Sequence, residues 1–149
     1  MKKLIGLTSL MLVFTGLFSG FAQNTSDTRL LSSPDVCEDK IAFIYAEDLW
    51  VADKDGSNPR RLTIDEGIES NPVFSPDGSM IAFSAQYDGN TDVFVVPSTG
   101  GVPKRLTWHP SWDLVRDFTN DGKNVLFNSR RTNYTSRHAK LYTVSINGG

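Results

Sequence analysis

The sequence has little of what marks several common classes of protein. One cysteine, Cys37, stands among 149 residues, which excludes a disulfide framework because such a framework needs pairs of cysteines. The 15 basic and 17 acidic side chains give a net charge of −2, so the chain lacks the basic excess of nucleic-acid-binding proteins. After the N-terminal segment, no ten-residue stretch carries the apolar period of an amphipathic helix. We therefore expect an all-β globular body that binds no nucleic acid.

Groups that could activate a nucleophile or hold a metal ion are equally scarce. His109 stands between Trp108 and Pro110, and the second histidine, His138, lies in a polar segment. A nucleophile needs a base within hydrogen-bonding reach, and the sequence has no Gly-x-Ser-x-Gly elbow. The Asp-x-Asp pattern at Asp53 lacks the Gly and Glu that complete a calcium loop. We therefore predict no catalytic residue, no metal site and no cofactor in this chain.

The first 22 residues have the three parts of a secretory signal peptide. Two lysines supply the basic start, residues 4–21 carry no charge, and Ala22 ends a small-residue exit before Gln23. An N-terminal membrane anchor is the alternative, because 18 uncharged residues approach the length that spans a bilayer. Threonines and serines dilute the apolar stretch, which favours cleavage. We predict a signal peptide over residues 1–22 and an exported mature chain, periplasmic or secreted.

The rest of the chain repeats itself with a period of 44 residues. Residues 48–63 align without a gap with residues 92–107, and seven of the sixteen positions are identical. The Phe-Ser-Pro-Asp-Gly run at 74–78 returns as Phe-Thr-Asn-Asp-Gly at 118–122. Repeats of roughly 40–45 residues built from short strands are typical of β-propeller blades. The repeat therefore predicts a propeller.

Each repeat is predicted to form four antiparallel strands. In the second copy, turns rich in Pro, Asp and Gly separate the expected strands, which are residues 71–74, 79–85, 92–96 and 103–107. The third blade stops before its closing strand, and the expected blades are residues 29–63, 71–107 and 114–149. The predicted fold is an all-β propeller of four-stranded blades, with two complete blades and an incomplete third. Because closure takes about four to eight blades, we expect residues 23–149 to be the N-terminal part of a longer propeller.

Two longer runs within the repeats resemble a known family. Tyr87-Asp-Gly-Asn-Thr-Asp92 and Leu106-Thr-Trp-His-Pro110 are similar to the opening blades of tricorn protease homologues. The generic Phe-Ser-Pro-Asp-Gly run is shared with TolB-like propellers. The resemblance covers residues 29–149 and implies a six-bladed propeller, followed by a second propeller, a PDZ-like module and a serine-peptidase core. It also implies that the nucleophile, its histidine and the oxyanion donors lie in that C-terminal part, outside this chain.

Among the charged residues, Arg116 is the candidate for contact with a passing peptide. It falls on a predicted first strand, the strand that lines the central channel of a propeller. Basic pairs could also hold peptide carboxylates by forked hydrogen bonds; they are Arg60-Arg61, Lys104-Arg105 and Arg130-Arg131. The first two pairs lie on predicted fourth strands, where pairing with Asp residues of the next blade is favoured. A solvated loop is expected for the acidic residues Asp65, Glu66 and Glu69.

These observations support one leading function and two alternatives. The leading hypothesis is the non-catalytic N-terminal propeller portion of an exported tricorn-like serine peptidase, which channels peptides toward a C-terminal active site. Its expected partners are peptides or unfolded polypeptide, together with the remaining blades and catalytic domains; a homo-oligomer is also compatible. The first alternative is a TolB-like periplasmic scaffold that binds envelope proteins. The second, less favoured, is the propeller of a prolyl-peptidase-type enzyme.

Overall fold

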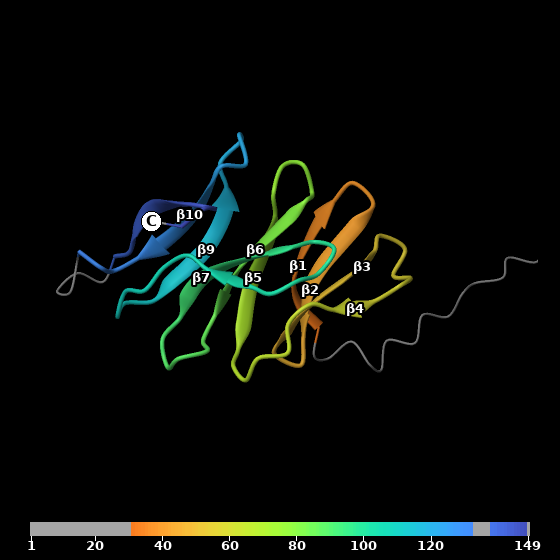
Figure 1. Cartoon of the computed structure of the whole chain (residues 1–149), viewed down its shortest axis with the longest axis horizontal. Coiled ribbons are helices and arrows are strands. Elements are labelled where there is room, and N and C mark those ends of the chain that lie inside the picture. Colours follow the sequence, from red (N-terminus) through yellow and green to blue (C-terminus); the bar gives the residue numbers. More distant parts are fainter. Residues whose placement is uncertain (1–30, 133–137, 149) are drawn as a thin grey trace, which may run out of the picture.

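The computed structural model describes residues 31–132 and 138–148, and every regular element within them is a β-strand. Figure 1 shows these strands as small sheets that follow one another along the long axis of the chain. The expected signal peptide, residues 1–22, and the start of the first expected blade at Arg29 lie outside the described residues. The described part contains no helix of the length and apolarity that a bilayer crossing requires.

Eleven strands in the described residues form three antiparallel sheets. The first sheet has the order β1-β2-β3-β4, with bounds Leu31–Cys37, Lys40–Tyr45, Asp48–Asp53 and Arg60–Arg61. The second has the order β5-β6-β7-β8, with bounds Glu69–Phe74, Met80–Ala85, Asp92–Pro97 and Lys104–Arg105. The third pairs β9 with β10 and β10 with β11, with bounds Asp113–Phe118, Asn124–Ser129 and Lys140–Ser145. Two four-stranded sheets and a three-stranded third confirm the predicted propeller fold.

The turns between the first and second strands show how local sequence folds each hairpin. Gly78 and Gly122 lie 44 residues apart, and both take a φ of 68°, a conformation that glycine adopts without steric cost. In each turn the glycine N–H donates to a carbonyl three residues earlier, Ser75 O or Thr119 O, at 2.8 Å. The Asp-Gly pair therefore forms the same turn once in each of these two repeats.

Two apolar clusters hold the three sheets together. The middle sheet contributes to both clusters, because successive side chains of a strand point to opposite faces. Ile81 and Phe83 of β6 join buried residues of the first sheet such as Leu49. Ala82, between them, belongs instead to the cluster that contains Phe127 of the third sheet. Burial of these side chains is what fixes the stacking of the sheets.

The first strands of the sheets, β1, β5 and β9, lie next to one another, as the innermost strands of propeller blades do. Each of them shifts register once against its partner strand. Side chains also tie neighbouring sheets: Asp35 Oδ2 accepts from Phe74 N at 2.7 Å, and Ser84 Oγ accepts from Val115 N at 2.8 Å. One side-chain hydrogen bond therefore links β1 to β5, and another links β6 to β9.

The fourth strands are shorter than the sequence predicts. Residues 103–107 were expected to form one strand, but β8 contains only Lys104–Arg105. Beyond it, Leu106 N donates to Val93 O at 2.7 Å, and the next ladder bond is replaced by Val93 N donating to Thr107 Oγ1 at 3.0 Å. The strand ends early because a threonine side chain takes the place of a backbone carbonyl.

Candidate functional site

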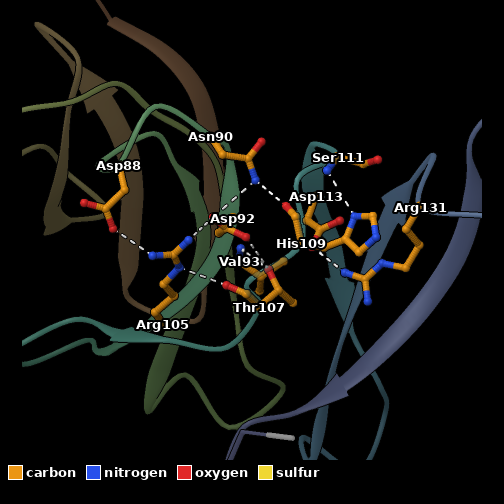
Figure 2. Close-up of polar contacts among 10 residues, drawn as sticks. All are labelled: Asp88, Asn90, Asp92, Val93, Arg105, Thr107, His109, Ser111, Asp113 and Arg131. Atoms are coloured by element: carbon orange, nitrogen blue, oxygen red, sulfur yellow. Dashed lines mark hydrogen bonds and ion pairs between the residues drawn. The ribbon is translucent and has the colours of Figure 1, made fainter. Parts of the chain in front are cut away.

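Polar side chains gather at one end of the sheets, where the chain passes from one sheet to the next (Figure 2). Arg105 Nη2 donates to Asp92 Oδ2 at 2.6 Å, and Nη1 donates to Asp88 Oδ2 at 2.7 Å. Thr107 Oγ1 lies 3.2 Å from Asp92 Oδ1 and accepts the Val93 N–H. These contacts hold the outer edge of the second sheet, whose fourth strand is only two residues long.

The first sheet repeats this network with the same residue types. Arg61 Nη2 donates to Asp48 Oδ1 at 2.6 Å, and Thr63 Oγ1 accepts from Leu49 N at 2.9 Å. Each arginine therefore pairs with an Asp of its own sheet, so the prediction that it pairs with the next blade is wrong. The register is the reason: it sets Arg61 opposite Trp50, within reach of the residue two positions earlier.

In the first two basic pairs the other member, Arg60 or Lys104, does reach the next sheet, but it binds backbone carbonyls. Arg60 donates to Thr99 O at 3.1 Å and to Ser98 O at 3.3 Å. Lys104 Nζ donates to Ile146 O at 3.3 Å. All three acceptors lie in turns that follow the third strand of the neighbouring sheet, β7 or β11. In each of these two pairs, one cation binds a carboxylate of its own sheet and the other binds backbone carbonyls of the next sheet.

Two buried carboxylates open the innermost strands of the second and third sheets. Glu69 and Asp113 occupy equivalent positions 44 residues apart, and their exposed fractions are 2% and 0%. Tyr87 Oη donates to Glu69 Oε1 at 2.6 Å, whereas Arg131 donates to Asp113 Oδ2. Within the described residues, Glu69 Oε2 and Asp113 Oδ1 have no hydrogen-bond partner. Glu69 therefore does not belong to the solvated loop that the sequence suggested, because it lies at the buried start of β5.

We define two joints, each of which groups these contacts around a backbone hydrogen bond that links two sheets, Glu69 N to Glu47 O or Asp113 N to Thr91 O, at 2.9 Å. The first joint, between the first and second sheets, consists of Asp48, Arg61, Thr63, Glu69 and Tyr87. The second joint, between the second and third sheets, consists of Asp92, Arg105, Thr107, Asp113 and Arg131. Every residue of the first joint corresponds to one of the second at the 44-residue offset. The joints have the same first three residue types. They differ at the last two positions, where Glu69 and Tyr87 correspond to Asp113 and Arg131.

The lack of a cation beside Glu69 changes how its carboxyl group titrates. Burial raises the pKa of Glu69 from 4.5 to about 7, and the charge of Asp48 adds to the rise. Hydrogen bonds act in the opposite direction, that from Tyr87 more than that from Thr63, and they are too weak to restore an ordinary value. The same burial, together with the contact with Glu69, raises the pKa of Tyr87. Glu69 is therefore half protonated near neutral pH.

A cavity of about 440 Å³ lies beside the second joint. His109 and Arg131 line it together with the exposed ring of Trp108. His109 Nδ1 accepts the Ser111 N–H at 3.0 Å, which leaves the proton of a neutral imidazole on Nε2. The guanidinium of Arg131 also stacks over the Phe127 ring at 4.8 Å. The polar groups that these two residues offer are hydrogen-bond donors, so the cavity suits an anionic or carbonyl group.

Arg116, the sequence candidate for peptide contact, lies exposed on β9. It occupies the irregular position of this strand, where the pairing with β10 shifts register. With the Asn128 amide oriented to satisfy both neighbours, Asn128 Oδ1 accepts from Arg116 Nη2 at 3.0 Å and its nitrogen donates to Leu114 O at 3.1 Å. Arg116 is therefore an exposed cation on an innermost strand, and its guanidinium lies against Asn128 of β10.

Metal-binding geometry is absent from the part of the chain that the structure describes: no group of three or more His, Cys, Asp or Glu side chains could hold an ion. The functional pairs that sequence reasoning missed are Glu69 with Tyr87 and Asp113 with Arg131. A signal for them exists, because the 44-residue offset relates one pair to the other. The two pairs differ in residue type, however, so identity between repeats did not reveal them.

Comparison with known proteins assigns the family. The model of the tricorn protease N-terminal beta propeller domain matches residues 28–149. The chain belongs to this family. Tricorn protease homolog 1 of Streptomyces coelicolor is 34% identical to it over 110 residues, which are 73% of this chain and 10% of that protein.

Solved structures of a tricorn protease and of TolB both superpose on this chain. The tricorn protease crystal structure superposes with a TM-score of 0.64 at 26% identity, over 76% of this chain and 12% of that one. TolB from Acinetobacter baumannii superposes with a TM-score of 0.65 at 25% identity, over 80% of this chain and 31% of that one. This tricorn-type propeller chain thus spans about a tenth of the length of these two tricorn proteins.

Proposed function

We propose that this chain is the non-catalytic N-terminal propeller portion of an exported tricorn-like serine peptidase and that it guides peptides toward a C-terminal active site. The observation that carries the proposal is the position of Arg116. This residue projects from an innermost strand, β9, which lies against β5. Innermost strands border the axis of a propeller, so a cation there meets any peptide that passes along it.

The cavity beside the second joint gives independent support for peptide handling. Its donors, Arg131 and His109, are held by Asp113 and by the Ser111 N–H. A planar guanidinium and an imidazole N–H match the acceptors of a peptide carbonyl or carboxylate. The proposal therefore assigns this end of the propeller to positioning peptides, and it assigns bond cleavage to a serine elsewhere.

The test compares peptide hydrolysis by the full-length natural protein and its Arg116→Ala variant. We expect Arg116→Ala to raise KM for long peptides while kcat for short peptides stays the same, because a channel residue acts on access and position. Lys123→Ala, which removes an exposed cation of the same sheet, is the matched control. A serine-directed covalent inhibitor should label a residue outside 23–149. Labelling of a serine within this chain would refute the non-catalytic assignment.

The alternative, a TolB-like scaffold that binds other proteins, is favoured by a specific surface feature. The connections between sheets expose large apolar side chains at equivalent repeat positions, Ile64 with Trp108 and Ile68 with Trp112. Exposed tryptophans are common anchors in protein interfaces. A full-length protein that forms a stable complex with an envelope protein and cleaves no peptide would favour this second function.

Export is part of the proposal and rests on the composition of residues 1–22. A basic start followed by an uncharged stretch and a small-residue exit directs secretion. Sequencing of the mature protein is expected to return Gln23 as its first residue. An intact Met1 on protein recovered from the cytoplasm would contradict export and leave the peptidase assignment to the hydrolysis test.

A further inference from the structure

A second cavity, of about 310 Å³, lies beside the first joint. Its walls combine apolar side chains with two carboxylates, and its lining is Leu31, Ser32, Ile44, Ala46, Glu47, Ile68 and Glu69. Leu31 and Glu69 begin β1 and β5, the innermost strands of their sheets. The cavity therefore opens at the axial end of the propeller, beside the route proposed for peptides.

The carboxylate of Glu69 is buried in this lining and only half satisfied. Oε1 accepts the Tyr87 hydroxyl at 2.6 Å, and Oε2 has no partner among the described residues. A buried ionised oxygen without a partner is costly, because it has lost water and gained nothing in return. Glu47, exposed at the rim, adds a second negative charge to the same cavity.

At the second joint, the buried carboxylate in the equivalent backbone position has a cationic partner. Asp113, the equivalent of Glu69, is paired with the guanidinium of Arg131. The residue equivalent to Arg131 in the first joint is Tyr87, which supplies a hydroxyl but no charge. Arg61, the nearby cation of the first joint, is engaged by Asp48 and by Thr63 O. The second joint pairs its buried carboxylate with an arginine of this chain. The first joint has the equivalent buried carboxylate, and no arginine of the described residues is paired with it.

We infer that the cavity beside the first joint binds a cationic group on an apolar stem, supplied by a peptide. Lysine and arginine side chains and a peptide amino terminus share this chemistry. In the bound state the stem lies against Ile44, Ala46 and Ile68. The carboxyl group of Glu69, whose Oε2 is closed to solvent in the free chain, turns to meet the cation, and Glu47 lies at the rim. Long cationic side chains combine an apolar stem with a charged head in this way. The inference deepens the proposed function and rests on it for the identity of the ligand as a peptide.

The electrostatics of the site agree with an organic cation. The raised pKa of Glu69 reflects burial without a counter-charge, and a bound cation lowers such a pKa because it favours the ionised form. Asp48 and Tyr87 contribute to the pKa shift of Glu69, and no cation does. Glu47 adds a carboxylate to the cavity lining, and Arg61, the nearby cation, is engaged by Asp48. The described residues include no carboxylate cluster suited to a metal ion, and the apolar walls fit a carbon stem.

The test measures binding of short peptides to the full-length natural protein by calorimetry at pH 8, where Glu69 is mostly ionised. Four probes separate the sources of the cation: N-acetylated tripeptide amides centred on Lys, Arg or norleucine, and a tripeptide amide with a free amino terminus and no basic side chain. We expect at least one cationic probe to bind and the norleucine probe, which has the stem alone, to bind at least about tenfold more weakly.

Two variants and a control assign the binding to this cavity. Glu69→Gln keeps the shape and removes the charge, and Tyr87→Arg supplies in cis the cation that Arg131 provides at the second joint. Both are expected to weaken the binding of cationic probes about tenfold or more. Glu66→Gln, which removes an exposed carboxylate outside the cavity lining, is expected to change it less than twofold. Thermal unfolding of each variant establishes that it is folded.

The inference is overturned if no cationic probe binds, if norleucine binds as well as lysine, or if Glu66→Gln weakens binding as much as Glu69→Gln. Binding of divalent metal alone, with no binding of the cationic peptides, would also overturn it. Because the measurement involves no turnover, its failure is distinct from failure of the proposed peptide-handling function, which the hydrolysis of long and short peptides decides.

Discussion

The two joints between sheets have the same backbone plan and different charges. At the second joint Asp92 and Asp113 each have an arginine of this chain, Arg105 and Arg131. At the first joint the buried carboxylate of Glu69 has a tyrosine hydroxyl in place of an arginine. The repeat therefore specifies where a carboxylate sits and leaves its partner free to vary. Stability should depend on a salt bridge at the second joint and on pH at the first.

Removal of the cation from the second joint should have the largest effect. Arg131→Ala leaves Asp113, which is fully buried, without a counter-charge, and we expect the free energy of unfolding to fall by about 3–5 kcal/mol. Urea unfolding followed by circular dichroism measures the change. The double variant Asp113→Asn, Arg131→Ala is the control and should recover at least half of the loss, because no unpaired charge stays buried. A double variant less stable than the single one would contradict this explanation.

The first joint should make stability depend on pH. The pKa of Glu69 is raised from 4.5 to about 7, so the folded protein binds a proton that the unfolded chain releases between these values. The contribution of Glu69 to the free energy of unfolding is therefore fully present below about pH 4.5 and is lost as pH rises through 7, by up to about 3 kcal/mol. Unfolding curves of wild type and Glu69→Gln between pH 5 and 8 give the measurement. An equally steep decrease in the variant would assign the pH dependence to another group.

A smaller contrast is expected between the arginines that close the sheets. Arg105 is 23% exposed and binds two carboxylates, whereas Arg61 is 43% exposed and binds one. Arg105→Ala should cost about 1–3 kcal/mol, and Arg61→Ala less than about 1 kcal/mol, because water screens an exposed pair. Double-mutant cycles of Arg105 with Asp92 and of Arg61 with Asp48 measure the two coupling energies. Equal couplings would show that the pairs experience the same solvent screening.

Sequence reasoning succeeded where the structure depends on neighbours along the chain. Turn glycines such as Gly78 and the alternation of apolar residues predicted the hairpins and the propeller fold, because both signals act within a few residues. It failed where contacts cross between strands. The fourth strand is shorter than predicted because Thr107 replaces a backbone acceptor. Arg61 binds its own sheet because of a register that the sequence does not display.

The 44-residue period was enough to determine the four-stranded unit, the order of its turns and the membership of a propeller family, since each unit folds through local signals repeated along the chain. Only the tertiary structure decided which side chains meet across the joints. Glu69 looks like a member of an acidic loop in the sequence, and it is buried because β5 packs against the first sheet. Its raised pKa follows from that packing, because the cost of a charge depends on the solvent and partners that surround it.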